Sequence, residues 1–131
     1  MNSHITGIGG VFFRTSDPDK TRNWYQETFG LKMESWGCIF KWRDYENPSN
    51  PGSTTWGPFK NETDYFGSTN QAYMINYRVR DLELLLKELS EKGILPVKEM
   101  EIMDYGKFAW IEDCNGIRME LWEPVDSAFG I

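Results

Sequence analysis

The sequence predicts an α+β protein made of two copies of one β-α-β-β-β module. Each copy begins with a strand that leads to an aspartate, Asp17 in the first copy and Asp81 in the second, and each continues with a helix. Each copy also closes on a Trp-x-Pro strand end, Trp56-Gly57-Pro58 or Trp122-Glu123-Pro124. Two units of the same order imply a pseudo-twofold protein with a site between its halves.

The first module is expected to cover residues of about 5–58. Asp17 can cap a helix and Pro18 suits its first position, while Gly30 ends it. Gly37 interrupts an aromatic and aliphatic stretch, which predicts a turn between two strands. The expected elements are a strand over 7–15, a helix from Pro18 to Gly30, two strands within 31–43, a loop over 47–52 and a short strand over 53–56.

The second module is expected to cover residues of about 72–124. A leucine stripe, Leu82, Leu85, Leu86 and Leu89, predicts a helix from Asp81 to about Lys92. The remaining elements are strands over 72–80, 97–103, 106–112 and 117–123, with a tight turn over 113–116. The connection of about 59–71 carries Phe59, Tyr65 and Phe66, so it either covers a groove or merely crosses the sheet edge.

Composition excludes several classes of function. The net charge is −6 and no basic cluster is present, which argues against nucleic-acid binding. No stretch approaches the roughly 20 apolar residues of a membrane span. The amino terminus has no basic head or apolar segment, so a cytoplasmic protein is expected, with Cys38 and Cys114 reduced. Six tryptophans exceed what packing usually needs, so some are expected to line a cavity.

Several motifs together resemble the vicinal oxygen chelate superfamily, the group of glyoxalase I, bleomycin-resistance proteins and extradiol dioxygenases. They are Asp17 followed by Trp24-Tyr25, the Asp81-Leu82 helix start, the Phe108–Asp113 strand before an Asp-x-x-Gly turn, and Arg118–Pro124. The resemblance covers essentially the whole chain. It implies a single glyoxalase-like domain over 1–131, in which the paired modules form an incomplete barrel around a site. It also implies a divalent metal in many members, and a homodimer.

The four metal-ligand positions of that family fall on Gly10, Met74, Thr54 and Glu120. The first two lie seven residues before Asp17 and Asp81, and the other two lie on the last strand of each module. Only Glu120 offers a donor of the expected kind, because divalent cations need several His or carboxylate ligands. His4, the only histidine, lies outside the predicted cavity. We therefore expect no metal and no other cofactor.

Strand alternation predicts which side chains face the cavity. The candidate ligand-binding residues are Phe12, Arg14, Trp56, Met74, Asn76, Arg78, Tyr105, Phe108, Trp110 and Trp122. An apolar cavity with a few polar groups is the usual form of a small-molecule site. The alternative is that the aromatic residues close the barrel as a core, and that the two arginines only pair with acids.

Glu120 is the candidate catalytic residue. In an aromatic cavity its carboxylate would be poorly hydrated, which favours the protonated form and suits a general base or a ligand anchor. If Arg14 or Arg78 pairs with it, the carboxylate is instead ionised and inert.

Three functions remain open. The first is a metal-free protein that binds a small aromatic or amphipathic molecule. The second is a lyase or isomerase of the glyoxalase I type, either metal-dependent or with Glu120 as general base. The third is an interaction module whose barrel is only a scaffold.

Overall fold

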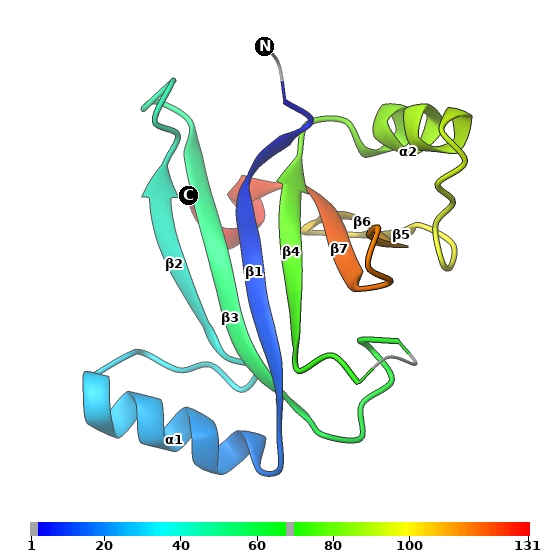
Figure 1. Ribbon diagram of the computed structural model, residues 1–131. Helices are drawn as coiled ribbons and strands as arrows, with labels where there is room; N and C mark the ends of the chain where they lie inside the picture. Colours follow the sequence, from blue (N-terminus) through cyan, green and yellow to red (C-terminus); the bar gives the residue numbers. More distant parts are fainter. Residues whose placement is uncertain (1–2, 68–69) are drawn as a thin grey trace.

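The computed structural model describes residues 3–67 and 70–131, which form one seven-stranded mixed sheet with two α-helices (Figure 1). The sheet order is β2-β3-β1-β4-β7-β6-β5. The strands are β1 (Ile5–Thr15), β2 (Cys38–Arg43), β3 (Pro51–Lys60), β4 (Tyr73–Val79), β5 (Glu101–Met103), β6 (Gly106–Glu112) and β7 (Arg118–Pro124). The helices are α1 (Pro18–Phe29), α2 (Leu82–Glu91) and the short 3₁₀ helix η1 (Asp126–Phe129).

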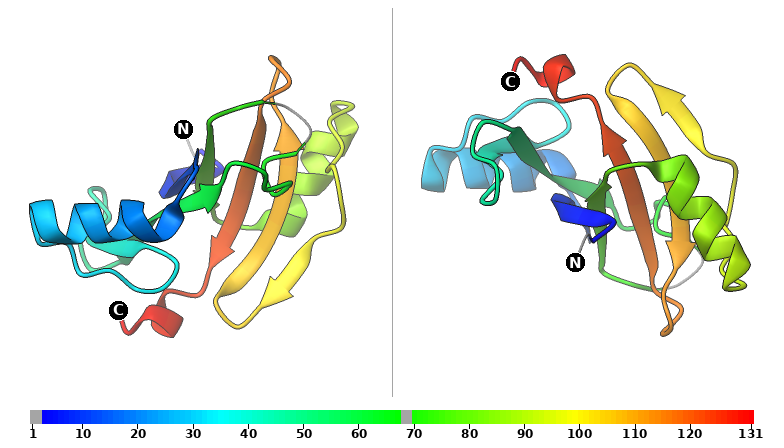
Figure 2. Two further views of the ribbon diagram at one scale, coloured as in Figure 1. Left: turned by 90° about the horizontal axis from the view of Figure 1, so that it is seen from below. Right: turned by 90° about the horizontal axis from the view of Figure 1, so that it is seen from above.

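The two modules meet at the centre of the sheet, where β1 and β4 run antiparallel. On its outer side β1 pairs in parallel with β3, and β4 pairs in parallel with β7. The helices α1 and α2 lie at opposite corners of the sheet, as a pseudo-twofold arrangement requires (Figures 1 and 2). The order begins with β2 and ends with β5, so the described strands form an open sheet. The predicted α+β class with two paired modules is confirmed.

The first module has one strand fewer than predicted. Residues 31–43 contain only β2, because 31–37 forms an irregular segment in place of a strand. Within it the backbone groups of Glu34 and Gly37 bond each other, with N···O distances of 2.7 and 3.3 Å. These bonds close a turn, so the segment does not continue the sheet beyond β2.

Two other strand boundaries were wrong. The short strand expected over 53–56 is the ten-residue β3, because β3 lies between β1 and β2 and bonds to both. The strand expected over 97–103 shrinks to β5, the edge strand. The chain bends at residues 97–98, so the strand does not extend back from β5, although Val97 N still bonds to Trp110 O of β6 at 2.9 Å.

Both helices begin where the sequence predicts. The Asp17 side chain accepts a hydrogen bond from Lys20 N at 3.0 Å, and the Asp81 side chain accepts one from Leu84 N at 3.1 Å. The helices differ in packing. No side chain of α1, which is described throughout, is fully buried, whereas Leu82 and Leu85 of α2 are buried.

Two apolar clusters lie on opposite faces of the second half of the sheet. One joins α2 to the sheet through Val79, Leu82, Leu85, Ala109, Ile111 and Leu121. The other consists of Phe66, Met74 and Trp110, with Phe12, Phe59, Tyr65 and Phe108 packed against it. The second cluster lies on the side of the sheet away from α2, and it carries the site described below.

The leucine stripe of α2 allows a stability test within one helix. Leu82 is fully buried and Leu84 is 46% exposed. We expect Leu82→Ala to lower the free energy of unfolding by about 2–5 kcal/mol, because it leaves a cavity under the helix. The control Leu84→Ala is expected to change it by less than about 0.5 kcal/mol. Urea denaturation measures both, and equal losses would contradict the assigned face.

Candidate functional site

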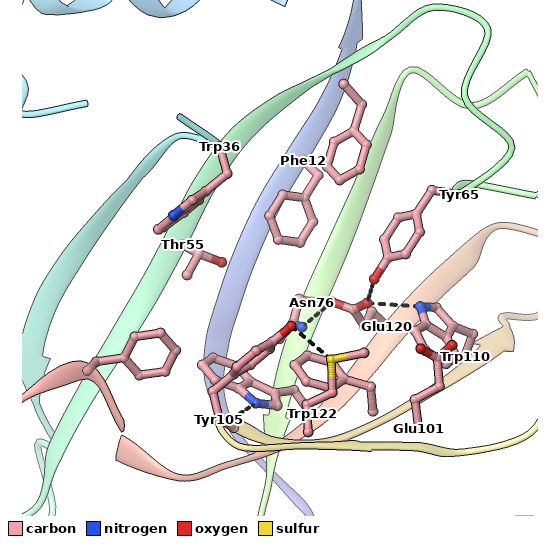
Figure 3. A pocket seen from close by; sticks show the side chains of 14 residues that line it. Phe12, Trp36, Thr55, Tyr65, Asn76, Glu101, Tyr105, Trp110, Glu120 and Trp122 are labelled. Atoms are coloured by element: carbon pink, nitrogen blue, oxygen red, sulfur yellow. Dashed lines mark hydrogen bonds between the residues drawn. The ribbon is translucent and has the colours of Figure 1, made fainter. Parts of the chain in front are cut away.

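A pocket of about 580 Å³ opens between the two halves of the sheet (Figure 3). Its walls come from both modules and from the segment that follows β7. The lining residues are Phe12, Trp36, Thr55, Phe59, Tyr65, Asn76, Glu101, Met103, Tyr105, Phe108, Trp110, Glu120, Trp122 and Phe129. Most of the lining residues are aromatic.

Glu120 lies at the floor of this pocket and is 2% exposed. Its Oε1 accepts a hydrogen bond from Asn76 Nδ2 at 2.5 Å, and its Oε2 accepts one from Trp110 Nε1 at 2.9 Å. The hydroxyl of Tyr65 also donates to Oε2. The three donors converge on the carboxylate from three separate segments (Figure 3).

Burial dominates the protonation of Glu120. It raises the pKa of the carboxyl above its ordinary value of 4.5, since a charged group is poorly solvated in the pocket floor. The three hydrogen bonds oppose this shift, as does the positive charge of Lys98. Burial and the neighbouring carboxylate also raise the pKa of Tyr65, so its hydroxyl stays protonated and remains a donor.

The aromatic walls are held in place by contacts between rings. Phe108 stacks on Trp122 with centroids 5.7 Å apart, and Phe59 stacks on Tyr65 with centroids 5.2 Å apart. Phe129 of η1 packs edge-on against Trp122 at 5.7 Å. These contacts fix the relative positions of aromatic side chains in the walls from both modules.

Seven of the candidate residues line this pocket: Phe12, Asn76, Tyr105, Phe108, Trp110, Glu120 and Trp122. Met74 lies directly behind it, fully buried against Phe66 and Trp110. The structure therefore brings most of the candidate set together, on the face that strand alternation predicts.

Trp56 and Thr54 lie on the opposite face of β3 from the one predicted. Trp56 packs against Phe13 and against Tyr25 of α1, with ring centroids 5.1 and 4.6 Å away. Thr54 accepts a hydrogen bond from Trp42 Nε1 at 2.8 Å. The predicted phase of β3 was wrong by one residue. Thr55, which pairs with Gly10 of β1, faces the pocket.

The two arginines are also outside the pocket lining. Arg14 donates to the backbone oxygens of Gln71, Asn61 and Thr63, and thereby holds the connection between the modules. Arg78 is ion-paired with Asp126 at 2.8 Å. Its guanidinium also lies 5.2 Å from the ring of Trp42 and 5.4 Å from that of Trp122. Their role in this structure is to support the fold around the site.

Sequence reasoning missed seven lining residues: Trp36, Thr55, Phe59, Tyr65, Glu101, Met103 and Phe129. Tyr65 matters most, because it bonds to Glu120. Its only signal was the aromatic content of the long connection, which left open whether the connection covers a groove or merely crosses the sheet edge, and which gave no partner for Tyr65. Trp36 and Phe129 lie outside regular strands, where no periodicity shows which way a side chain points.

The donor set of the site does not fit a divalent metal. Glu120 already accepts three hydrogen bonds, and Met74 is buried among aromatic rings. Gly10 has no side chain, and Thr55 Oγ1 donates to Gly9 O at 3.0 Å. Across residues 3–67 and 70–131, no group of three or more His, Cys, Asp and Glu side chains could hold a metal ion. A tight metal site needs more ionised ligands than this floor provides.

The family model described as Glyoxalase/Bleomycin resistance protein/Dioxygenase superfamily matches residues 4–121. The chain belongs to this superfamily, as its motifs predict. A search of curated protein sequences found no match.

Solved structures with the same fold include proteins of different named activity. Methylmalonyl-CoA epimerase from Mycobacterium tuberculosis is 16% identical and has a TM-score of 0.64, with 100% of this chain and 96% of that chain covered. A variant of the Streptomyces coelicolor epimerase in complex with 2-nitronate-propionyl-CoA is 14% identical, with a TM-score of 0.69 and coverage of 92% and 99%.

A third match, named as an NAD-dependent benzaldehyde dehydrogenase from Legionella pneumophila, is 16% identical. Its TM-score is 0.53, with coverage of 88% and 98%. At such identities the likeness shows the fold alone.

Within the described part of the chain, neither α1 nor α2 has the length and apolar character needed to cross a membrane.

The raised pKa of Glu120 predicts a pH-dependent effect on stability. A buried carboxyl with a raised pKa favours the folded state most below its ordinary value of 4.5, and this contribution is lost as pH rises through the folded-state pKa. Glu120→Gln removes the titration. The variant keeps the hydrogen bonds if the Asn76 amide turns its oxygen toward the new amide.

We therefore expect the unfolding free energy of wild type minus that of Glu120→Gln to fall as pH rises above about 4.5. Urea denaturation at several pH values measures this difference. Glu112→Gln, at an exposed position of β6, is the control and should show no such trend. A difference that grows with pH would show that the carboxyl is stabilised in its charged form.

Proposed function

We propose that this protein binds a small aromatic or amphipathic molecule in the pocket between its modules, without a metal. The observation that supports the proposal most directly is the pocket lining: aromatic rings on all sides and a small number of polar groups at the floor. A cavity of about 580 Å³ is in the range that drug-sized ligands occupy.

Glu120 would serve as the polar anchor. A carboxylate has about four acceptor positions, and protein donors use three of them here. One position remains for a ligand. Because Tyr65, Asn76 and Trp110 hold the group in place, a ligand would meet a fixed acceptor and need not order it on binding.

The ligand class, the oligomeric state and the cellular location of the protein stay predictions. The composition supports a small-molecule ligand in preference to nucleic acid, and the resemblance supports a homodimer. The cytoplasmic location expected from the sequence is likewise a prediction.

Filling the pocket should abolish binding. Met103 and Ile102 are neighbours on the edge strand β5, but only Met103 lines the pocket. We expect Met103→Trp to abolish binding because the indole occupies ligand space, whereas Ile102→Trp, at a position 68% exposed, should leave affinity unchanged. Isothermal titration with a panel of aromatic and amphipathic compounds measures both variants.

The positive result is that at least one compound of the panel binds wild type in the titration and also raises its melting temperature. If no compound shifts wild type, the proposal fails. If Met103→Trp and Ile102→Trp bind alike, the ligand binds elsewhere and the assignment of the pocket is wrong.

One observation favours an enzyme as the second candidate. A buried carboxyl with a raised pKa, facing an apolar pocket, is a suitable general base. The epimerases with this fold act on methylmalonyl-CoA, which suggests an isomerase or lyase that moves a proton at an acidic carbon.

Proton NMR in D₂O tests this candidate. The enzyme hypothesis predicts that the protein exchanges the C2 proton of methylmalonyl-CoA for deuterium, and that Glu120→Gln abolishes the exchange while remaining folded. If wild type exchanges this proton no faster than Glu120→Gln does, the enzyme hypothesis fails for methylmalonyl-CoA and the binding function remains.

A further inference from the structure

We propose that the ligand of this pocket carries a cationic nitrogen, a quaternary ammonium or a protonated amine, beside an aromatic or aliphatic body. The inference rests on the proposed binding function and names the class of molecule that the same site selects. Three independent features of the described residues support it: the ring faces of the lining, its charge, and the position of one lysine.

The lining has the composition of an aromatic cage. The aromatic members are Phe12, Trp36, Phe59, Tyr65, Tyr105, Phe108, Trp110, Trp122 and Phe129. The face of an aromatic ring carries partial negative charge and attracts a cation within about 6 Å of its centroid. Cages of several rings are therefore suited to ammonium groups, which lose water on entering and regain electrostatic contact with the rings.

The charged groups of the lining have one sign. Glu101 and Glu120 are acidic, and among the lining residues that the structure describes there is no Lys, Arg or His. The chain as a whole has a net charge of −6, which also attracts cations. An anionic ligand would meet two carboxylates in the lining, and the neighbouring base Lys98 is already ion-paired with Glu101, so the arrangement disfavours an anion.

The protein's own ammonium group already occupies such an environment beside the pocket. Lys98 Nζ lies 4.0 Å from the centroid of the Trp110 ring and 5.7 Å from that of Tyr65. The same nitrogen is 3.1 Å from Glu101 Oε2. Two rings and one carboxylate of the lining therefore already contact a cationic nitrogen of the chain itself, which supports their suitability for an ammonium group.

The charge on Glu120 sets the pH dependence of this selectivity. The groups that face its carboxylate are Tyr65 from the connection, Asn76 from β4, Trp110 from β6 and, by charge, Lys98 before β5. Only the ionised carboxylate attracts a cation. Since burial raises the pKa of Glu120, affinity for a cation should increase as pH rises through that pKa, and affinity for a neutral ligand should not.

A pair of probes of the same shape tests the inference. The cation choline and the neutral 3,3-dimethyl-1-butanol differ only in the charged nitrogen, and neither has a second group that ionises near pH 8. By isothermal titration at about pH 8, where the carboxylate is more ionised, we expect the cation to bind about tenfold more tightly. At about pH 5 that ratio should shrink.

Single substitutions test which residues cause the preference for the cation. Glu101→Gln should weaken cation binding about threefold and leave the neutral probe unchanged. Glu99→Gln makes the same change in net charge at an exposed position outside the lining, so it is the matched control and should change neither. Lys98→Met removes the competing ammonium and should strengthen cation binding only.

Each outcome decides one claim. Equal binding of the two probes overturns the inference and leaves the binding function intact. A preference for the cation that Glu99→Gln weakens as much as Glu101→Gln reflects diffuse charge and also overturns it. If neither probe nor any compound of the wider panel binds, the proposed function itself fails. A cation preference that responds to Glu101 and Lys98 alone supports the inference.

Discussion

The structure depends on the burial of one carboxylate. Glu120 sits 2% exposed at the centre of the molecule, and its hydrogen-bond donors come from the connection between the modules, from β4 and from β6. Leaving a buried polar group without its hydrogen-bond partner costs about 1–3 kcal/mol, so each of these bonds favours a fixed position of its segment around Glu120. Tyr65 in turn stacks on Phe59 of β3 and links the carboxylate to the wall formed by the first module.

The same constraint determines what the site can do. The family resemblance predicts a metal-ligand position at Glu120, but here its oxygens already bond to a phenol, an amide and an indole. Thr55, across the sheet, donates to a backbone oxygen. What remains is a pocket with aromatic walls and an acidic floor, which is suited to the recognition of an organic molecule. The arginines that could have paired with Glu120 bind other segments: Arg14 binds the connection, and Arg78 binds Asp126 at the start of η1.

The sequence predicted the fold class because the two modules repeat signals that act locally. Asp17, Asp81 and the leucines of α2 depend only on neighbours within a helix turn, and they were read correctly. The phase of β3 could not be read in the same way, because Thr54, Thr55 and Trp56 offer no clear alternation of polar and apolar residues. Segment 31–37 was included in a predicted strand because residues 31–43 are aromatic and aliphatic as a whole, but it contains only one strong strand former, Trp36. A turn closed by Glu34 and Gly37 keeps it out of the sheet. Tyr65 was missed as a partner of Glu120 because 55 residues separate them, and no local pattern encodes so distant a contact.

An anomalous difference map from crystals soaked in Mn²⁺ or Zn²⁺ tests the central claim most directly. If Glu120 is committed to its three protein donors, the map shows no peak within about 2.5 Å of its oxygens, and the bonds from Tyr65, Asn76 and Trp110 persist. A peak bound to Glu120, with these donors displaced, would contradict the account.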